Sequence, residues 1–166
     1  MSKITLKGNP VNTCGALPAI GSKAPDFLLT KSDLSDVSLK NYAGKNLVIN
    51  IFPSVDTAVC AASVRRFNKD ITSVPDTVCL CVSLDLPFAH KRFCAAEGIE
   101  NVDTSTELRE RKFGEDYGVR MVDGPLAGLL SRAVVIVGKD GNVVYTQQVP
   151  DITEEPDYEK ALAALK

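Results

Sequence analysis

Blocks of apolar residues alternate with amphipathic stretches along this chain. Residues 47–52, 77–83 and 133–137 form mostly continuous apolar runs, which are typical of strands buried on both faces of a sheet. Asp140-Gly141 follows the last run and predicts a tight turn into residues 143–145. We expect that segment to pair antiparallel with the run before it.

Helical spacing fills the intervals between these runs. After Pro53, apolar residues recur with a period near 3.6 and predict a helix that begins near Thr57. Residues 87–97 and 107–117 each have the pattern of a helix and are each followed by a glycine. Pro156 is expected to open a last helix. The apolar stripe of that helix consists of Tyr158, Leu162 and Leu165.

The order of these elements, β-α-β-α-α-β-β-α, predicts an α/β fold. We expect a thioredoxin-like fold with a mixed central sheet flanked by helices on both faces. Residues 1–20 precede this pattern and predict a short N-terminal β-hairpin or arm, with turn residues at Gly8-Asn9-Pro10 and again at Gly15 and Pro18. No repeat, low-complexity tract or charged linker interrupts the sequence, so we expect one domain over residues 1–166.

Length and charge narrow the function classes. The 166 residues have a net charge of −2, without the cluster of Lys and Arg that a nucleic-acid surface requires. No apolar stretch approaches the ~20 residues of a membrane span. Residues 1–10 contain no apolar signal-peptide core. We therefore expect a cytoplasmic protein that binds neither nucleic acid nor membrane.

Five cysteines are informative for such a protein, because stable structural disulfides are rare in the cytoplasm. No pair of them has the spacing of a zinc knuckle, and the chain has only one histidine. A Gly-x-Gly-x-x-Gly fingerprint is also missing from the sequence. We expect no metal, flavin or nicotinamide cofactor, and we expect each cysteine to be either a buried apolar residue or a redox-active thiol.

Cys60 has the most distinctive position of the five. It follows a predicted buried strand and falls in or near the first turn of a predicted helix. The backbone N–H groups of a first turn lack intrahelical partners and favour an anion such as a thiolate. Thr57, three residues earlier, can place its hydroxyl close to the sulfur. The position alone leaves open that Cys60 is a core residue of an amphipathic helix, the commoner case for a lone cysteine.

The residues around Cys60 resemble a known active-site motif. Pro53, Thr57 and Cys60 follow the pattern Pro-x-x-x-Thr-x-x-Cys of the peroxiredoxins. The wider run over residues 50–63 closely resembles the thiol peroxidase (Tpx) subfamily, the atypical two-cysteine peroxiredoxins. The likeness extends over nearly the whole chain. It includes residues 84–89, 92–94, 123–126 and 155–158.

The resemblance implies a role for five residues. Cys60 would be the peroxidatic cysteine and Cys94 the resolving cysteine, joined in a disulfide within one subunit. Pro53 would shield the sulfur, and Thr57 would hydrogen-bond to the thiolate and the peroxide. Arg132, just before a late core strand, matches the active-site arginine.

The same resemblance implies an activity and its partners. The activity is the reduction of hydrogen peroxide and alkyl hydroperoxides to water and alcohols, an antioxidant function. Thioredoxin would supply the electrons, and the protein would form a homodimer.

The other reactive side chains have simpler interpretations. Cys79 and Cys81 lie two apart in a predicted buried strand, where packing is the expected role. Cys81 falls where the subfamily often has a buried cysteine, whereas Cys14 and Cys79 are outside its active-site pattern. We expect His90 to be a surface residue on a polar helix face.

Two rival functions remain open at this point. Cys60-Ala61-Ala62-Ser63 also has the form of a monothiol version of the Cys-x-x-Cys motif of thiol–disulfide oxidoreductases. Arg132, where such an enzyme would have a cis-proline loop, suits a peroxide better than a peptide disulfide. The second rival is a redox-sensing interaction module whose Cys60–Cys94 switch controls a partner.

Overall fold

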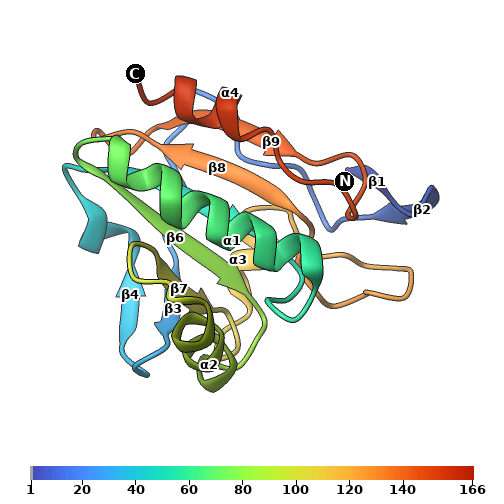
Figure 1. Ribbon diagram of the computed structural model, residues 1–166. Helices are drawn as coiled ribbons and strands as arrows, with labels where there is room; N and C mark the ends of the chain where they lie inside the picture. The colour runs from blue at the N-terminus through green and yellow to red at the C-terminus, as the bar shows by residue number, and fades with distance from the viewer. Residues whose placement is uncertain (1) are drawn as a thin grey trace.

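Seven strands form one mixed sheet in the computed structural model, which describes residues 2–166 (Figure 1). Their order across the sheet is β4-β3-β7-β6-β5-β8-β9. β5, β6 and β7 run parallel, whereas the remaining pairs are antiparallel. The strands are β3 (Leu28–Lys31), β4 (Asp36–Ser38), β5 (Asn46–Ile51), β6 (Thr77–Ser83), β7 (Asp103–Thr106), β8 (Ala133–Val137) and β9 (Val143–Gln148).

The three apolar runs of the sequence are the neighbouring central strands β6, β5 and β8, which confirms that prediction. The turn at Asp140-Gly141 is also confirmed, since β9 pairs antiparallel with β8. The strands β3, β4 and β7 were not predicted. These strands have three or four residues each, and the sequence of β7 is Asp-Thr-Ser-Thr. A segment so short and polar has no strand pattern of its own. It becomes a strand because it pairs with the strands on either side.

Four α-helices accompany the sheet, together with the 3₁₀ turns η1 (Leu39–Tyr42) and η2 (Ile71–Ser73). The helices are α1 (Ala58–Asp70), α2 (Pro87–Glu97), α3 (Lys112–Asp116) and α4 (Tyr158–Ala163). α1 begins after Thr57, as predicted, and α2 has the predicted bounds with Gly98 in the left-handed conformation that ends it. α4 begins two residues after Pro156, because the Asp157 side chain accepts the Lys160 N–H and caps the helix there.

The predicted helix over residues 107–117 is wrong in its length. Arg111 has a φ of 55°, a left-handed conformation that interrupts any helix, so α3 begins only at Lys112. Glu107, expected in that helix, is buried instead. Its carboxylate accepts the Gly114 N–H at 2.9 Å and pairs with Arg120 at 3.0 Å. These tertiary contacts fix the segment as a turn.

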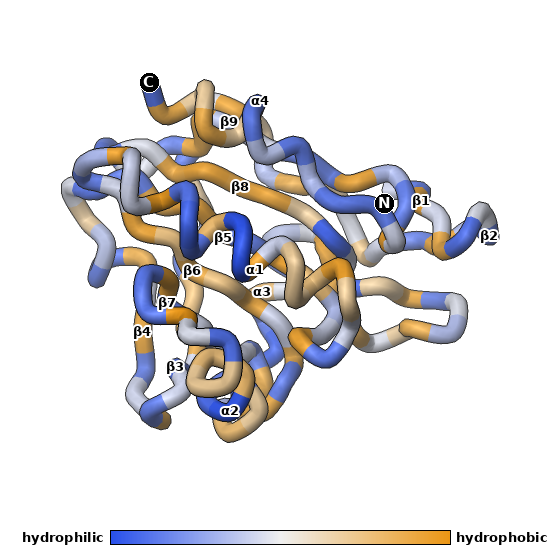
Figure 2. Tube along the Cα trace, in the orientation of Figure 1, coloured by the Kyte–Doolittle hydropathy of each residue, from blue (hydrophilic) through white to orange (hydrophobic). Residues whose placement is uncertain are grey.

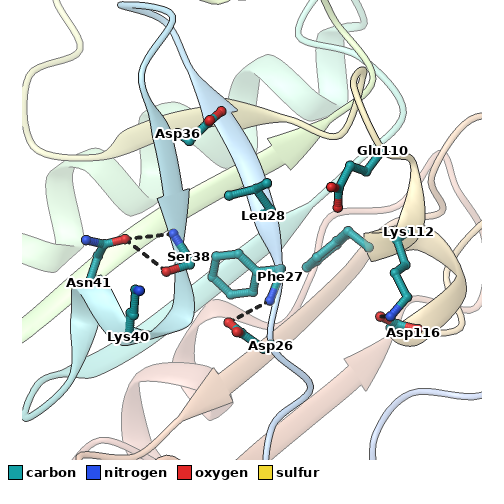
Figure 3. A pocket seen from close by; sticks show the side chains of 11 residues that line it. Asp26, Phe27, Leu28, Asp36, Ser38, Lys40, Asn41, Glu110, Lys112 and Asp116 are labelled. Carbon is teal, nitrogen blue, oxygen red and sulfur yellow. Dashed lines mark hydrogen bonds and ion pairs between the residues drawn. The ribbon is translucent and has the colours of Figure 1, made fainter.

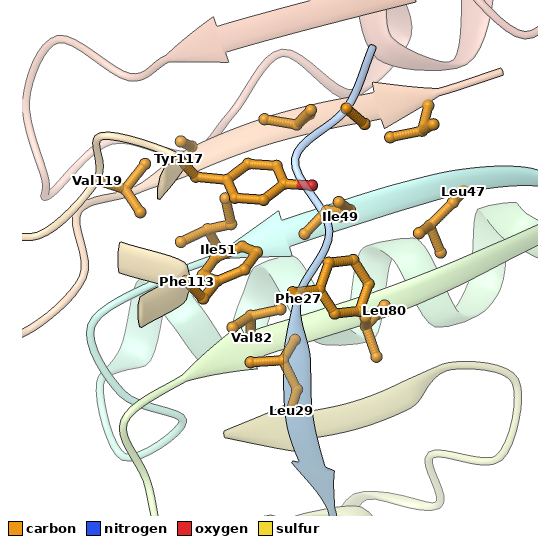
Figure 4. Close-up of a cluster of buried hydrophobic side chains, with 14 of the residues drawn as sticks. Phe27, Leu29, Leu47, Ile49, Ile51, Leu80, Val82, Phe113, Tyr117 and Val119 are labelled. Atoms are coloured by element: carbon orange, nitrogen blue, oxygen red, sulfur yellow. The ribbon is translucent and has the colours of Figure 1, made fainter. Parts of the chain in front are cut away.

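Side chains alternate across the sheet and build a separate core on each face. Along β5, Leu47, Ile49 and Ile51 face the layer that holds Phe113 and Tyr117 (Figure 4). Val48 faces the opposite layer, which holds α1, α4 and the buried face of α2. α1 crosses that side of the sheet in Figure 1, and the strands behind it are rich in apolar residues in Figure 2. Helices thus lie on both faces, although α3 and η1 give only short cover to the first.

The N-terminal hairpin is confirmed and consists of β1 (Lys3–Leu6) and β2 (Asn9–Asn12). Its turn is Lys7-Gly8, in which both residues have positive φ, as the twist of a two-residue hairpin requires. The turn predicted at Gly8-Asn9-Pro10 was therefore placed too late, since Asn9 and Pro10 already pair with β1. The backbone of Thr5 also exchanges hydrogen bonds with Pro150 and Ile152, at 2.9 Å each, which ties the hairpin to the segment before α4.

Candidate active site

The strand β5 delivers Cys60 to the start of α1. Pro53 is buried just beyond the strand, and Thr57 is the N-terminal cap residue of the helix. The first intrahelical hydrogen bond of α1 runs from the Ala61 N–H to the Thr57 carbonyl at 3.0 Å. Cys60, the third residue of a thirteen-residue helix, thus lies in the turn whose N–H groups lack helical acceptors. Its side chain is fully buried.

Arg132 lies next to this sulfur because of the register between β5 and β8. Ile51, the last residue of β5, pairs with Ala133, the first residue of β8, so Arg132 is beside the chain that leads to Cys60. The guanidinium is 2% exposed, and its Nη2 donates to Cys60 Sγ at 3.3 Å. A guanidinium so deeply buried is costly without polar partners, and Cys60 Sγ is one of them.

The three nitrogens of Arg132 have different surroundings. Nε donates to the Ile152 carbonyl at 2.8 Å, which fixes the plane of the guanidinium. Nη2 contacts the sulfur. Nη1 is buried and has no hydrogen-bond partner among residues 2–166. A buried donor without an acceptor is costly, and this one still has hydrogen bonds to give.

Pro53 and Thr57 lie in the same loop as expected, but their contacts differ in kind. Pro53 is buried between the end of β5 and α1. The Thr57 side chain is exposed, and its hydroxyl donates to the Ser54 carbonyl at 3.0 Å. In this state the hydroxyl therefore stabilises the loop. Its predicted contact with thiolate and peroxide stays a prediction.

Asp85 organises this loop from the end of β6, a role that sequence reasoning missed. Its carboxylate accepts the Ser54 hydroxyl at 2.6 Å, the Val55 N–H at 2.9 Å and the Ser83 hydroxyl at 2.6 Å. The signal available was its position directly after a buried strand, within residues 84–89, which resemble the thiol peroxidases. This one carboxylate thus fixes the side chain of Ser54 and the backbone of Val55 in the loop before Cys60.

Cys94 lies on α2 and is half-buried against the apolar layer that contains Cys60. Burial raises the pKa of the Cys94 thiol, and a hydrogen bond with Thr104 opposes that shift. The ion pairs Arg92–Asp56 (3.0 Å) and Arg65–Glu97 (3.5 Å) join α2 to α1 and the loop before it. None of the five cysteines is in a disulfide in the described chain.

The remaining cysteines lie away from the Arg132 nitrogens or deeper in the core. Cys79 and Cys81 are fully buried in the layer beneath α1, where packing is the expected role. Burial raises the pKa of Cys79 well above its usual value. Cys14 is exposed, and its thiol contacts the Gly114 carbonyl at 3.3 Å.

His90 contradicts the expectation of a surface residue. Its ring is fully buried on the inner face of α2, with Nε2 3.0 Å from Ser83 Oγ. Burial lowers the pKa of this imidazole, whereas the charge of Asp85 opposes that shift. The prediction failed because α2 has charged residues beside His90 on the chain, and the packing of β6 and β7 decides which face turns inward.

A cavity of about 520 Å³ lies on the other face of the sheet, near Phe27 and Phe113 (Figure 3). Its rim mixes acidic and basic side chains, among them Asp26 and Lys112. It does not include Cys60 or Arg132. Within residues 2–166 no group of side chains is arranged to hold a metal ion, and no helix has the length and apolar character to cross a membrane.

Comparison with known proteins finds relatives over nearly the whole chain. Residues 19–162 match the family model described as Redoxin. The chain is 59% identical over 165 residues to the thiol peroxidase of Mycobacterium tuberculosis (strain ATCC 25618 / H37Rv), with 99% of each chain covered.

Solved structures agree as well. A peroxiredoxin-like protein from Aquifex aeolicus superposes with a TM-score of 0.94 at 38% identity, over 99% of this chain and 96% of that one. A thiol peroxidase from Chromobacterium violaceum gives a TM-score of 0.91 at 22% identity, over 98% and 94% of the two chains, and supports the fold alone.

A thioredoxin-like sheet with a buried cysteine at a helix start and an arginine against its sulfur defines a cysteine-dependent peroxidase of the peroxiredoxin type. Within that class, the chain belongs to the thiol peroxidase family.

Proposed function

We propose that Cys60 reduces hydrogen peroxide and alkyl hydroperoxides, that Cys94 resolves the oxidised sulfur, and that thioredoxin regenerates both thiols. The contact of Arg132 Nη2 with Cys60 Sγ at 3.3 Å, beside an unpartnered Nη1, is the observation that carries the proposal. One nitrogen contacts the nucleophilic sulfur, and its neighbour is free to donate to the oxygen that leaves with the electron pair.

In the first step the Cys60 thiolate attacks one oxygen of the hydroperoxide. An S–O bond forms and the O–O bond breaks, and the second oxygen leaves with the electron pair. That oxygen takes up a proton and becomes water or an alcohol, while Cys60 becomes a sulfenic acid. The sulfur is oxidised by two electrons and the peroxide is reduced by two.

Thiolate formation alone cannot account for an efficient peroxidase. For a cysteine in general, lowering the pKa from about 8.5 to about 6 raises the thiolate fraction at pH 7 roughly 30-fold. Intrinsic nucleophilicity falls by about 10-fold over the same change. The larger contribution must come from donors that stabilise negative charge on the leaving oxygen, and Arg132 Nη1 is placed to be one of them.

In the second step the Cys94 thiolate attacks the sulfenic sulfur. A disulfide forms and the oxygen leaves as water once a proton is added. A disulfide requires the two Cα atoms to lie within about 7 Å. Because Cys60 is fully buried in α1 and Cys94 is part of α2, we expect local unwinding of at least one of these helices.

In the third step a thioredoxin dithiol reduces the Cys60–Cys94 bond and becomes a disulfide itself. Over one cycle a hydroperoxide and a dithiol yield an alcohol or water, a further water, and a disulfide. A cytoplasmic location, where thioredoxin keeps thiols reduced, fits this cycle. The assembly expected of the family is a homodimer, and Pro53 and Thr57 complete the peroxide site.

The decisive experiment counts peroxide molecules consumed per protein molecule with excess reduced thioredoxin. Many turnovers support the proposed enzyme. A single turnover favours the redox-sensing module, and no consumption favours the thiol–disulfide oxidoreductase. Sedimentation of the reduced protein tests the homodimer in parallel.

A further inference from the structure

A chain of hydrogen bonds runs from the loop before Cys60 to the helix that carries Cys94. Asp85 accepts from Ser54 and Val55 in that loop and from the Ser83 hydroxyl. Ser83 Oγ in turn lies 3.0 Å from His90 Nε2 on α2. The link is fully buried at Ser83 and at His90, so water does not compete for it.

The chemistry of the serine hydroxyl determines the direction of this link. A hydroxyl has one hydrogen, and that of Ser83 is donated to the Asp85 carboxylate at 2.6 Å. Ser83 must therefore accept from His90, which places the imidazole hydrogen on Nε2. His90 Nδ1 is buried and has no hydrogen-bond partner among residues 2–166. The neutral ring is thus held by its bond to Ser83, and the Ser105 backbone acts on it electrostatically.

We propose that His90 is a positioning residue: through Ser83 and Asp85 it fastens the resolving helix α2 to the peroxidatic loop, and this link must break for Cys94 to reach Cys60. The inference rests on the proposed function and concerns its second step. The surface ion pair Arg92–Asp56 joins the same two elements, but such exposed pairs contribute little. The buried link is the stronger tie between them.

The charges around His90 give the link a dependence on pH. Burial lowers the pKa of the ring, whereas the carboxylates of Asp85 and Asp56 and the backbone of Ser105 oppose that shift. When α2 unwinds, the ring enters water, where its pKa is about 6.5. Below that pH the open form takes up a proton that the closed form resists, so acid favours opening. Above that pH the effect disappears.

Two substitutions separate the hydrogen bond from the proton. His90→Gln keeps an N–H that can donate to Ser83 but cannot titrate, whereas His90→Leu removes the donor. Lys91→Gln, at the exposed neighbouring position on α2, is the matched control. The reduced proteins are mixed with stoichiometric hydrogen peroxide and quenched with acid and an alkylating agent. Mass spectrometry then times peroxide attack on Cys60 and formation of the Cys60–Cys94 bond separately.

The expected results differ for each variant. At pH 7.5 His90→Leu forms the disulfide about fivefold faster relative to its peroxide step, the equivalent of one ordinary hydrogen bond. His90→Gln matches the wild type at that pH. At pH 5.5 the wild type exceeds His90→Gln by up to about tenfold, because only the wild-type ring is protonated on opening. The ratio of the two proteins cancels the titration of Cys94, which they share.

Equal relative rates in the wild type and His90→Gln at both pH values would overturn this inference while leaving the peroxidase intact. This comparison decides the question even if His90→Leu fails to fold. If the wild type forms no Cys60–Cys94 bond at all, the resolving role of Cys94 is wrong, and the inference falls with it.

Discussion

At the scale of single residues, the three nitrogens of one guanidinium have different roles in the proposed active site. Arg132 uses Nε for an anchor on Ile152, Nη2 for the sulfur and leaves Nη1 free. A lysine in this place would present one charged nitrogen and not the rigid, planar set of N–H donors of a guanidinium.

The first prediction concerns the five thiols. Cys60→Ser should abolish thioredoxin-coupled peroxidase activity, because only Cys60 lies at a helix start against Arg132. Cys14→Ser and Cys79→Ser are the matched controls and should keep most of it, since neither sulfur contacts the guanidinium. The measurement is peroxide consumption coupled to thioredoxin. Substantial activity in Cys60→Ser would refute the assignment.

The second prediction separates charge from transition-state stabilisation. Arg132→Met should slow peroxide attack at least tenfold more than its loss of thiolate explains. The thiolate fraction is read from ultraviolet absorbance, and the attack rate from single-turnover kinetics. If the rate falls no further than the thiolate fraction does, Arg132 acts only as a neighbouring charge.

The residues of the site were predictable to different degrees. The resemblance to a motif predicted roles for Cys60, Arg132 and Cys94, and the structure brings Arg132 to Cys60. Asp85 and His90 were not found. Their importance depends on which groups β6 and β7 place beside α2, and no local pattern encodes that. A histidine between charged residues in the sequence is predicted to be exposed when the strands that its helix packs against are not known.

At the scale of elements, α1 and α2 have well-defined boundaries, and the ion pairs that join them at the surface are exposed. The cap at Thr57 and the left-handed Gly98 define where these helices begin and end, and both boundaries were visible in the sequence. Between the helices lie the exposed pairs Arg92–Asp56 and Arg65–Glu97, each worth about 0–1 kcal/mol. Local opening of either helix is therefore inexpensive on the surface.

The third prediction follows from this arrangement. Oxidation to the disulfide should reduce amide hydrogen-exchange protection over residues 58–64 or 88–97, because we expect its closure to unwind at least one of these helices. Protection over the central strands β5 and β8 should stay unchanged and serves as the internal control. Equal protection of all these segments in reduced and oxidised protein would contradict the unwinding.

At the scale of the whole molecule, the central sheet was predictable because its strands are buried on both faces. A continuous apolar run, as in β8, reports that environment directly. The far side of the sheet, β7-β3-β4, was hidden because its strands are short and partly polar. The left-handed Arg111 and the Glu107–Arg120 pair that shorten α3 also depend on tertiary contacts.

The fourth prediction concerns the chain as a covalent unit. Stoichiometric peroxide should join Cys60 to Cys94 within one chain, closing a loop of about 34 residues, a length at which loop entropy is a modest cost. Non-reducing electrophoresis should show a monomer, and peptide mapping should find these two sulfurs joined. Cys94→Ser should reduce one peroxide, stall as a sulfenic acid and over-oxidise readily. A bond from Cys60 to Cys79, Cys81 or a second chain would show that Cys94 is not the resolving residue.

The attachment of the N-terminal hairpin also bears on how the protein is made. Thr5 holds Ile152 by a backbone hydrogen bond, and the Ile152 carbonyl anchors Arg132. Two segments about 145 residues apart in the sequence must therefore meet before the guanidinium of Arg132 is fixed in this way. A nascent chain that ends before residue 150 already has Cys60 but lacks this anchor. We therefore expect full reactivity toward peroxide only once residues 150–152 have been synthesised and have docked on the hairpin.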